Sequence, residues 1–151
     1  LHPELDPKGQ GYQMNQAVLA VGSGGIWGRG FGQSRQKYQY LPEVSADTIF
    51  AVIAEENGFL ISTALIVLVL LIVWRGFKIG MASDDPFGAL LVTGIMVWFG
   101  WQSFLNIGAT VGALPLTGVP LPFVSHGGSA LVMALAGAGI VLSVSRNSKI
   151  S

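Results

Sequence analysis

The chain contains no cysteine and little charge. Its 151 residues include 8 basic and 8 acidic side chains, so 11% of the residues are charged and the net charge is zero. Without cysteine, a disulfide framework and thiolate chemistry are excluded, and a neutral chain is not typical of a nucleic-acid-binding protein. Soluble domains average about 25% charged residues. The low charge and the 51% content of hydrophobic residues therefore indicate a membrane protein.

The chain also lacks an initiating methionine and an apolar leader. Residues 1–13 are polar and contain Pro3, Pro7, Gly9 and Gly11, which favour loop structure. We therefore expect a fragment whose upstream part is missing.

Residues 1–46 are expected to form a large extramembrane loop region with one short helix. Apolar residues recur at helical spacing from Tyr12 to Val21 with amides between them, which predicts a helix at the membrane interface. Six glycines follow among residues 22–32. Such a segment is either a flexible surface loop or a loop shaped around an anionic head group. It is not a Walker motif, because no Gly-Lys-Ser/Thr sequence follows.

Long apolar runs in residues 47–151 predict an all-α, polytopic bundle of transmembrane helices. A bilayer requires roughly 20 apolar residues for each span. We place the three spans at about residues 47–77, 87–111 and 128–145. Asp84–Pro86 predicts a turn and a helix start. Gln102 and Asn106 lie one turn apart in the second span, where they either bond a neighbouring helix or line a cavity.

Residues 112–129 connect the second and third spans. They contain three prolines and four glycines, which are incompatible with a continuous helix, yet most of their other residues are apolar. Irregular backbone is tolerated at membrane depth only where protein or a water-filled cavity surrounds it. This connection is therefore predicted to be a re-entrant proline-rich loop.

Basic residues predict the orientation of the bundle, because cytoplasmic loops carry an excess of lysine and arginine. Four of them lie at or just beyond the ends of the first and third spans: Arg75, Lys78, Arg146 and Lys149. That end is expected to be cytoplasmic, so the region 1–46 and the proline-rich loop would share the outer side.

Charge of both signs concentrates just before the first apolar run. The ionisable residues there are Arg35, Lys37, Glu43, Asp47, Glu55 and Glu56. Ionisable groups at the edge of a membrane segment are costly, so this stretch predicts a functional site. On a helix Glu55 and Glu56 point about 100° apart, so we expect at most one to face a cavity and the other to pair or cap.

Three motifs resemble the SEDS family of polytopic cell-wall polymerases, which includes FtsW, RodA and SpoVE. The first is Gly-Tyr-Gln-x-x-Gln-x-x-x-Ala-x-Gly-Ser-Gly-Gly at residues 11–25. The second is Leu-Pro-Glu at 41–43, followed by Asp-x-Ile-Phe-Ala and Glu-Glu-x-Gly, and the third covers Leu114–Ser129. The order and extent of the motifs are similar to the C-terminal part of that family, a fragment of one larger membrane domain. Ser34–Glu43 is more similar to the division branch, FtsW, than to the elongation branch.

The resemblance implies a peptidoglycan glycosyltransferase that polymerises lipid II outside the bacterial cytoplasmic membrane. The partners that it implies are lipid II, the undecaprenyl-linked glycan, a class B penicillin-binding protein and other divisome proteins, with no nucleic acid. Two rival functions stay open, a lipid II flippase and a non-catalytic divisome scaffold. No pair of His or Cys ligands suggests a zinc site, and the need for a divalent cation, Mg or Mn, is left open.

The resemblance makes Asp47 the candidate catalytic base, with an N-cap as the alternative role. Arg35 and Lys37 would bind pyrophosphate or are solvated loop charges. Glu43 forms a structural ion pair or helps to bind a divalent cation. Other candidate substrate-binding residues are Glu55, Ser125, His126 and Ser129. For His126 a structural hydrogen bond is the alternative.

Overall fold

The computed structural model describes residues 10–30, 49–115, 117–125 and 127–146. Within these ranges the chain forms helices joined by turns and loops, and it contains no strand. The helices are α1 (Gln10–Ser23), α3 (Ile49–Met81), α4 (Pro86–Thr110) and α5 (Gly128–Arg146). The start of the first span, expected at about residue 47, lies outside the described residues, as does the boundary expected at residue 46.

Three of these helices are long and apolar enough to cross a membrane. They are α3 with 33 residues, α4 with 25 and α5 with 19. Large apolar side chains on all three face outward, for example Leu68, Leu90 and Leu142. So much exposed hydrocarbon is stable against lipid tails or further helices, not against water. The predicted all-α membrane bundle is confirmed.

Capping residues define the start of α4. The Asp85 carboxylate accepts hydrogen bonds from the N–H groups of Phe87 (3.1 Å) and Gly88 (2.9 Å). Pro86 occupies the first turn, where its missing N–H has no cost. The turn and helix start predicted at Asp84–Pro86 are confirmed.

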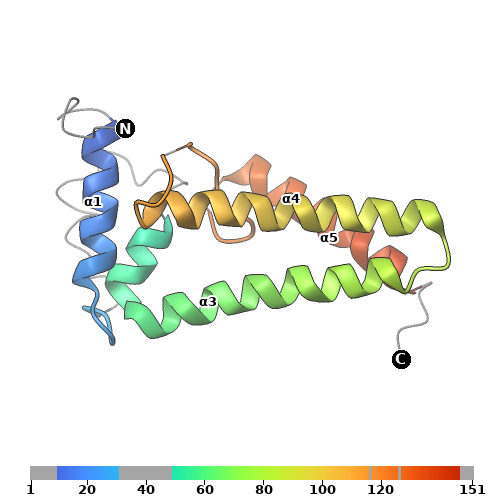
Figure 1. Ribbon diagram of the computed structural model, residues 1–151, viewed down its shortest axis with the longest axis horizontal. Helices are drawn as coiled ribbons and strands as arrows, with labels where there is room; N and C mark the ends of the chain where they lie inside the picture. The colour runs from blue at the N-terminus through green and yellow to red at the C-terminus, as the bar shows by residue number, and fades with distance from the viewer. Residues whose placement is uncertain (1–9, 31–48, 116, 126, 147–151) are drawn as a thin grey trace.

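α3 and α4 run antiparallel as neighbours, and α5 packs against both (Figure 1). Small residues let the helices approach closely. A Cβ atom on Gly76 of α3 would lie only 2.0 Å from the sulfur of Met96 on α4, and one on Gly137 of α5 would lie 3.2 Å from the ring of Phe99. The buried core of the bundle consists of Ile79, Val92, Met96, Phe99, Ala134 and Val141.

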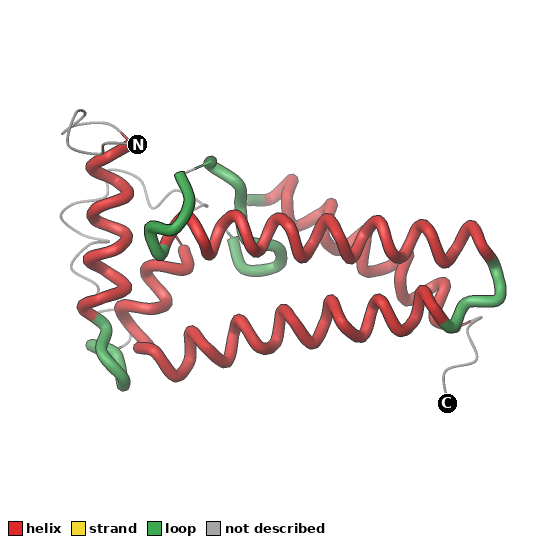
Figure 2. Tube along the Cα trace, in the orientation of Figure 1, coloured by secondary structure: helices red, strands yellow, loops and turns green. Residues whose placement is uncertain are grey.

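α1 lies across one end of the bundle rather than along it (Figure 1). Its buried residues Ala17 and Ala20 pack against Ala51 near the start of α3. Three alanines at this contact bring the two backbones close together. The short helix predicted at Tyr12–Val21 is confirmed as α1. The loop that follows α4 lies at the same end of the molecule (Figure 2).

Candidate functional site

The candidate site is built around a kink in α3 at Gly58. This residue has φ 75° and ψ −174°, a backbone conformation that glycine adopts readily and other residues rarely. The kink divides α3 into residues 49–57, which lie beside α1, and residues 59–81, which run along the bundle (Figure 2). A break of this kind deprives N–H and C=O groups of their partners within the helix.

The loop of residues 24–30, here called the glycine loop, satisfies these groups. Four backbone hydrogen bonds join the loop to the kink, given as donor to acceptor: Phe59 to Gly25 (2.9 Å), Leu60 to Ile26 (3.5 Å), Arg29 to Glu55 (3.0 Å) and Gly30 to Glu56 (3.0 Å). The loop therefore completes the hydrogen bonding of both helix ends at the kink. Buried backbone groups require such partners, so loop and kink stabilise each other.

Glycines make this close contact possible. A Cβ atom on Gly24 would lie 2.0 Å from the carbonyl oxygen of Ala54, and one on Gly28 would lie 2.2 Å from that of Glu56. The sequence left two possibilities for this segment, a flexible surface loop or an anion-binding loop, and binding of an anion stays a prediction. The loop is docked on α3, and the N–H groups of Arg29 and Gly30 already donate to carbonyl oxygens of α3.

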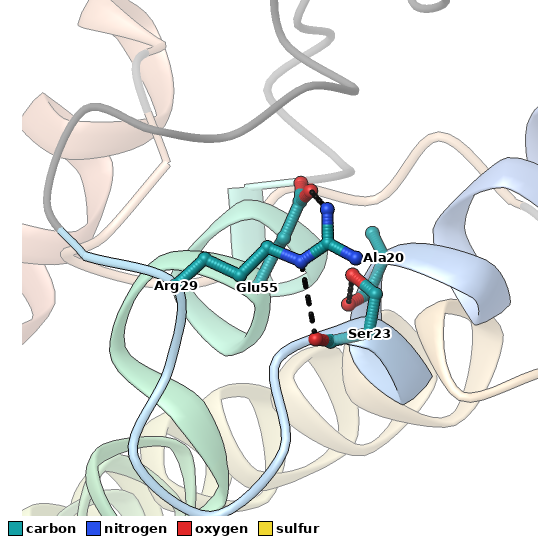
Figure 3. Close-up of polar contacts among 4 residues, drawn as sticks. All are labelled: Ala20, Ser23, Arg29 and Glu55. Carbon is teal, nitrogen blue, oxygen red and sulfur yellow. Dashed lines mark hydrogen bonds and ion pairs between the residues drawn. The ribbon is translucent and has the colours of Figure 1, made fainter.

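Two acidic side chains are buried where the glycine loop meets α3. The side chain of Glu55 is 1% exposed, and its Oε1 lies 3.9 Å from Nη1 of Arg29 (Figure 3). Glu56 is also buried, and its Oε1 accepts no hydrogen bond from the part of the chain that the structure describes. Of the two acids, it is Glu55, the predicted substrate contact, that pairs with a basic residue. Its contact with substrate stays a prediction.

The proline-rich loop folds back along α4. α4 ends in a Schellman motif, in which the N–H of Ala113 donates to the carbonyl of Gly108 (2.8 Å) and Gly112 has φ 79°. Further along, the ring of Phe123 packs edge-on against Phe99, with 5.2 Å between centroids. Phe99 lies roughly 16 Å from the helix end, at a rise of 1.5 Å per residue. The predicted re-entrant loop is thus confirmed.

Two amide side chains of α4 hold this loop by its backbone. Nδ2 of Asn106 donates to the carbonyl of Val119 (2.7 Å), and Nε2 of Gln102 donates to that of Pro120 (2.9 Å). The sequence predicted that the two amides lie on one face of the helix, where they would either bond a neighbouring helix or line a cavity. They bind irregular backbone instead, which lets carbonyl groups of the loop lie at membrane depth.

Replacing Asn106 with leucine is expected to destabilise the protein by about 1–2 kcal/mol, because the carbonyl of Val119 loses its donor while it stays partly buried. The measurement is thermal unfolding of the full-length protein in detergent. Asn15→Leu on the exposed face of α1 is the matched control. Equal unfolding temperatures for the two variants would contradict the assigned role of Asn106.

An open apolar groove with a volume of about 370 Å³ lies between α3, α4 and α5. Met96, Phe99 and Phe123 contribute to its wall, and Arg75 is the one charged residue among those that line it. Such a lining suits hydrocarbon rather than a sugar or a pyrophosphate. The polar chemistry of the molecule is therefore expected at the other end, where Glu55 and Glu56 are buried.

The remaining candidate residues divide into described and undescribed ones. The Ser125 hydroxyl is buried and accepts a hydrogen bond from the N–H of Leu121 (2.6 Å), so it closes a turn of the proline-rich loop. Ser129 is exposed in the first turn of α5. Five predicted site residues lie outside the described residues: Arg35, Lys37, Glu43, Asp47 and His126. Among the residues described, no three His, Cys, Asp or Glu side chains could hold a metal ion.

Sequence reasoning missed two residues of this site. Arg29 stands between glycines, where a single basic residue is typical of a solvated loop. Gly58 lies in a helical pattern that continues on both sides of it, which concealed the kink. The signal for both was the repeated glycine, because glycines at 24, 28 and 58 together indicate close contact between two backbones.

Comparison with protein families and curated proteins gives consistent matches. The profile of the FtsW/RodA/SpoVE family, described as cell cycle proteins, matches residues 1–150. Stage V sporulation protein E of Bacillus subtilis is 44% identical over 149 residues, which cover 99% of this chain and 41% of that protein. A probable peptidoglycan glycosyltransferase FtsW of Halothiobacillus neapolitanus is 49% identical over 146 residues, covering 95% of this chain and 35% of that protein.

Two solved structures share the fold. A peptidoglycan synthase complex, described as coordinating polymerization and crosslinking, contains a chain that is 36% identical with a TM-score of 0.74; the match covers 97% of this chain and 39% of that one. An aspartate-to-alanine mutant of the rod shape determining protein RodA from Thermus thermophilus is 34% identical with a TM-score of 0.66. That match covers 89% of this chain and 41% of the RodA chain. The present chain thus spans about two fifths of the proteins that it matches.

Proposed function

The chain belongs to the FtsW/RodA/SpoVE family of cell cycle proteins, and we propose that it forms part of a peptidoglycan glycosyltransferase that polymerises lipid II. The observation that carries the proposal is the match over 95% of the chain to a protein named as a probable peptidoglycan glycosyltransferase. Ionisable groups buried at one end of a membrane bundle support it, because such groups are costly and mark functional sites.

The proposed reaction joins an acceptor sugar to a lipid-linked donor. The acceptor hydroxyl oxygen bonds to the anomeric carbon of the donor, the bond from that carbon to the pyrophosphate oxygen breaks, and undecaprenyl pyrophosphate leaves with the electron pair. The hydroxyl proton passes to the Asp47 carboxylate. Arg35 and Lys37 stabilise the charge on the leaving pyrophosphate. Asp47 precedes Ile49, the first residue described in α3, by two positions.

A divalent cation, Mg²⁺ or Mn²⁺, would supply further positive charge against the pyrophosphate. Glu43 is its candidate ligand, and a carboxylate oxygen is the kind of donor that such ions prefer. This role belongs to a residue outside the described ranges. The carboxylates that the structure does describe at this end, those of Glu55 and Glu56, form no metal-binding cluster with a third acid or histidine among the described residues.

The charge distribution supports an outward-facing site. Arg75 and Lys78 near the end of α3 and Arg146 at the end of α5 lie at the end of the bundle opposite α1 (Figure 1). Of the four basic residues that the structure describes, Arg29 alone lies at the α1 end. Cytoplasmic ends carry an excess of such residues, so α1, the glycine loop and the buried acids are proposed to face the outside of the bacterial cytoplasmic membrane. In this orientation the protein acts on lipid II that is already in the outer leaflet.

The same distribution favours transfer over transport. A flippase moves a charged pyrophosphate through the bilayer, and groups that lower this cost are expected along its path. Residues 59–74, α4 and residues 128–145 contain no charged side chain. The described helices therefore place no charged side chain along a path between the two leaflets.

A class B penicillin-binding protein is the proposed partner, and other divisome proteins are expected to join the same assembly. The structure of the related synthase complex, which coordinates polymerization with crosslinking, supports this proposal. Outward-facing aromatic residues on α4 offer a membrane-embedded contact surface: the rings of Trp101 and Phe104 stack at 5.8 Å, and both are more than half exposed. Residues 59–74 of α3 are the second candidate surface.

The proposal predicts that the full-length protein, purified with its class B partner, converts fluorescent lipid II into long glycan strands. The measurement is gel separation of the products, with muramidase digestion as the control that identifies glycan. Movement of lipid II between leaflets of a vesicle without glycan synthesis would overturn the proposal in favour of the flippase. Absence of both activities, with the partner still bound, would favour the scaffold.

A further inference from the structure

The glycine loop and α3 meet through a buried acid and a half-exposed base. Oε1 of Glu55 lies 3.9 Å from Nη1 of Arg29, and the two side chains are 1% and 40% exposed. A carboxylate removed from water is stable only where a counter-charge or hydrogen bonds compensate for the lost hydration. Arg29 supplies such a counter-charge from a different segment of the chain.

Arg29 also contacts the end of α1. Its Nε–H donates to the carbonyl of Ser23 (3.3 Å), the last residue of that helix, whose hydroxyl donates to the carbonyl of Ala20 (3.0 Å). Figure 3 shows the guanidinium between Ser23 and Glu55. One side chain thus connects α1, the glycine loop and the first part of α3.

We propose that Arg29 and Glu55 are positioning residues for the glycosyl transfer, a role that rests on the proposed function. The ion pair and the four backbone hydrogen bonds hold residues 49–57 against α1, and Asp47 precedes the first of these residues by two positions in the sequence. Glu55 then acts through Asp47 rather than on the substrate. This reassigns a residue that the sequence placed among the substrate contacts.

The expected effect follows from how steeply catalysis depends on geometry. Displacing a reacting group by about 1 Å can lower a rate about a hundredfold. A loosened α3 start is expected to misplace the base, while the rest of the full-length protein still binds lipid II. The loss is therefore expected in kcat and not in KM.

The test measures lipid II polymerisation by the full-length protein with its partner. Arg29→Gln and Glu55→Gln are each expected to lower kcat about tenfold or more, with KM within about twofold of wild type. The double variant should lose less than the product of the two single losses, because the two changes share one contact. Arg29→Lys keeps the charge and should restore most of kcat. Arg75→Gln, at the other end of the bundle, is the control for losing an arginine.

Amide hydrogen exchange provides a readout that does not depend on activity. Residues 49–57 should exchange faster in Arg29→Gln and Glu55→Gln than in wild type, and at the wild-type rate in Arg75→Gln. Unchanged exchange would overturn the positioning role, as would a raised KM at constant kcat, which would make Glu55 a substrate ligand. If the wild type makes no glycan, the proposed function fails, whereas the exchange rates still decide whether the pair holds α3.

Discussion

Replacing Asp47 with asparagine in the full-length protein is expected to slow lipid II polymerisation by about 100- to 10,000-fold, the usual contribution of a general base. Asparagine has nearly the shape of aspartate but cannot take the proton of the acceptor hydroxyl. The substitution should leave the class B partner bound and the unfolding temperature within a few degrees of wild type. The measurement is the initial rate of glycan formation from fluorescent lipid II.

The same substitution at the opposite end of the bundle is the control. Asp84 is an exposed aspartate in the turn between α3 and α4, so Asp84→Asn changes the charge equally without approaching the proposed site. Its polymerisation rate should match wild type. If Asp47→Asn keeps more than about a tenth of the wild-type rate, Asp47 is not the base, because even a weak general base contributes about a hundredfold.

The membrane architecture could be predicted from the sequence because its determinants are local. An uninterrupted apolar run such as residues 59–74 is itself the requirement for crossing a bilayer, and a capping sequence such as Asp84–Pro86 defines a helix start through its own nearest neighbours. The re-entrant loop followed from prolines within an apolar segment. The family resemblance stated from the motifs is confirmed by the family match.

The arrangement of the candidate site could not be predicted, because its determinants are tertiary. Whether Gly58 bends α3 depends on acceptors that come from the glycine loop, a segment distant in the sequence. The pairing of Arg29 with Glu55 likewise follows from that docking and from no pattern in either segment. The sequence singled out Gln102 and Asn106 but did not predict that they bond the backbone of the proline-rich loop, since any buried acceptor satisfies an amide. The role of Asp47 stays a prediction.

Gly28→Ala is expected to destabilise the protein by roughly 2–5 kcal/mol. A methyl group at this position would lie 2.2 Å from the carbonyl oxygen of Glu56, which is backbone that cannot rotate away, and φ is 78°. Overpacking costs about 1–3 kcal/mol and a left-handed conformation about 1–2 kcal/mol more for a residue other than glycine. That sum is a large part of the 5–15 kcal/mol that typically stabilises a folded protein. The variant should therefore accumulate poorly and unfold at a lower temperature.

Two neighbouring glycines separate the contributions to this loss. Gly22 lies in α1 with nothing within 4 Å of a Cβ atom, so Gly22→Ala should be neutral or more stable by about 0.5–1 kcal/mol. Gly25 has φ 57° but open space around it, so Gly25→Ala should show the backbone strain alone. Thermal unfolding of the three full-length variants should rank them Gly22→Ala, Gly25→Ala, Gly28→Ala from most to least stable. If Gly28→Ala is no less stable than Gly25→Ala, close contact with α3 contributes nothing, and the glycine loop is not what holds the kink.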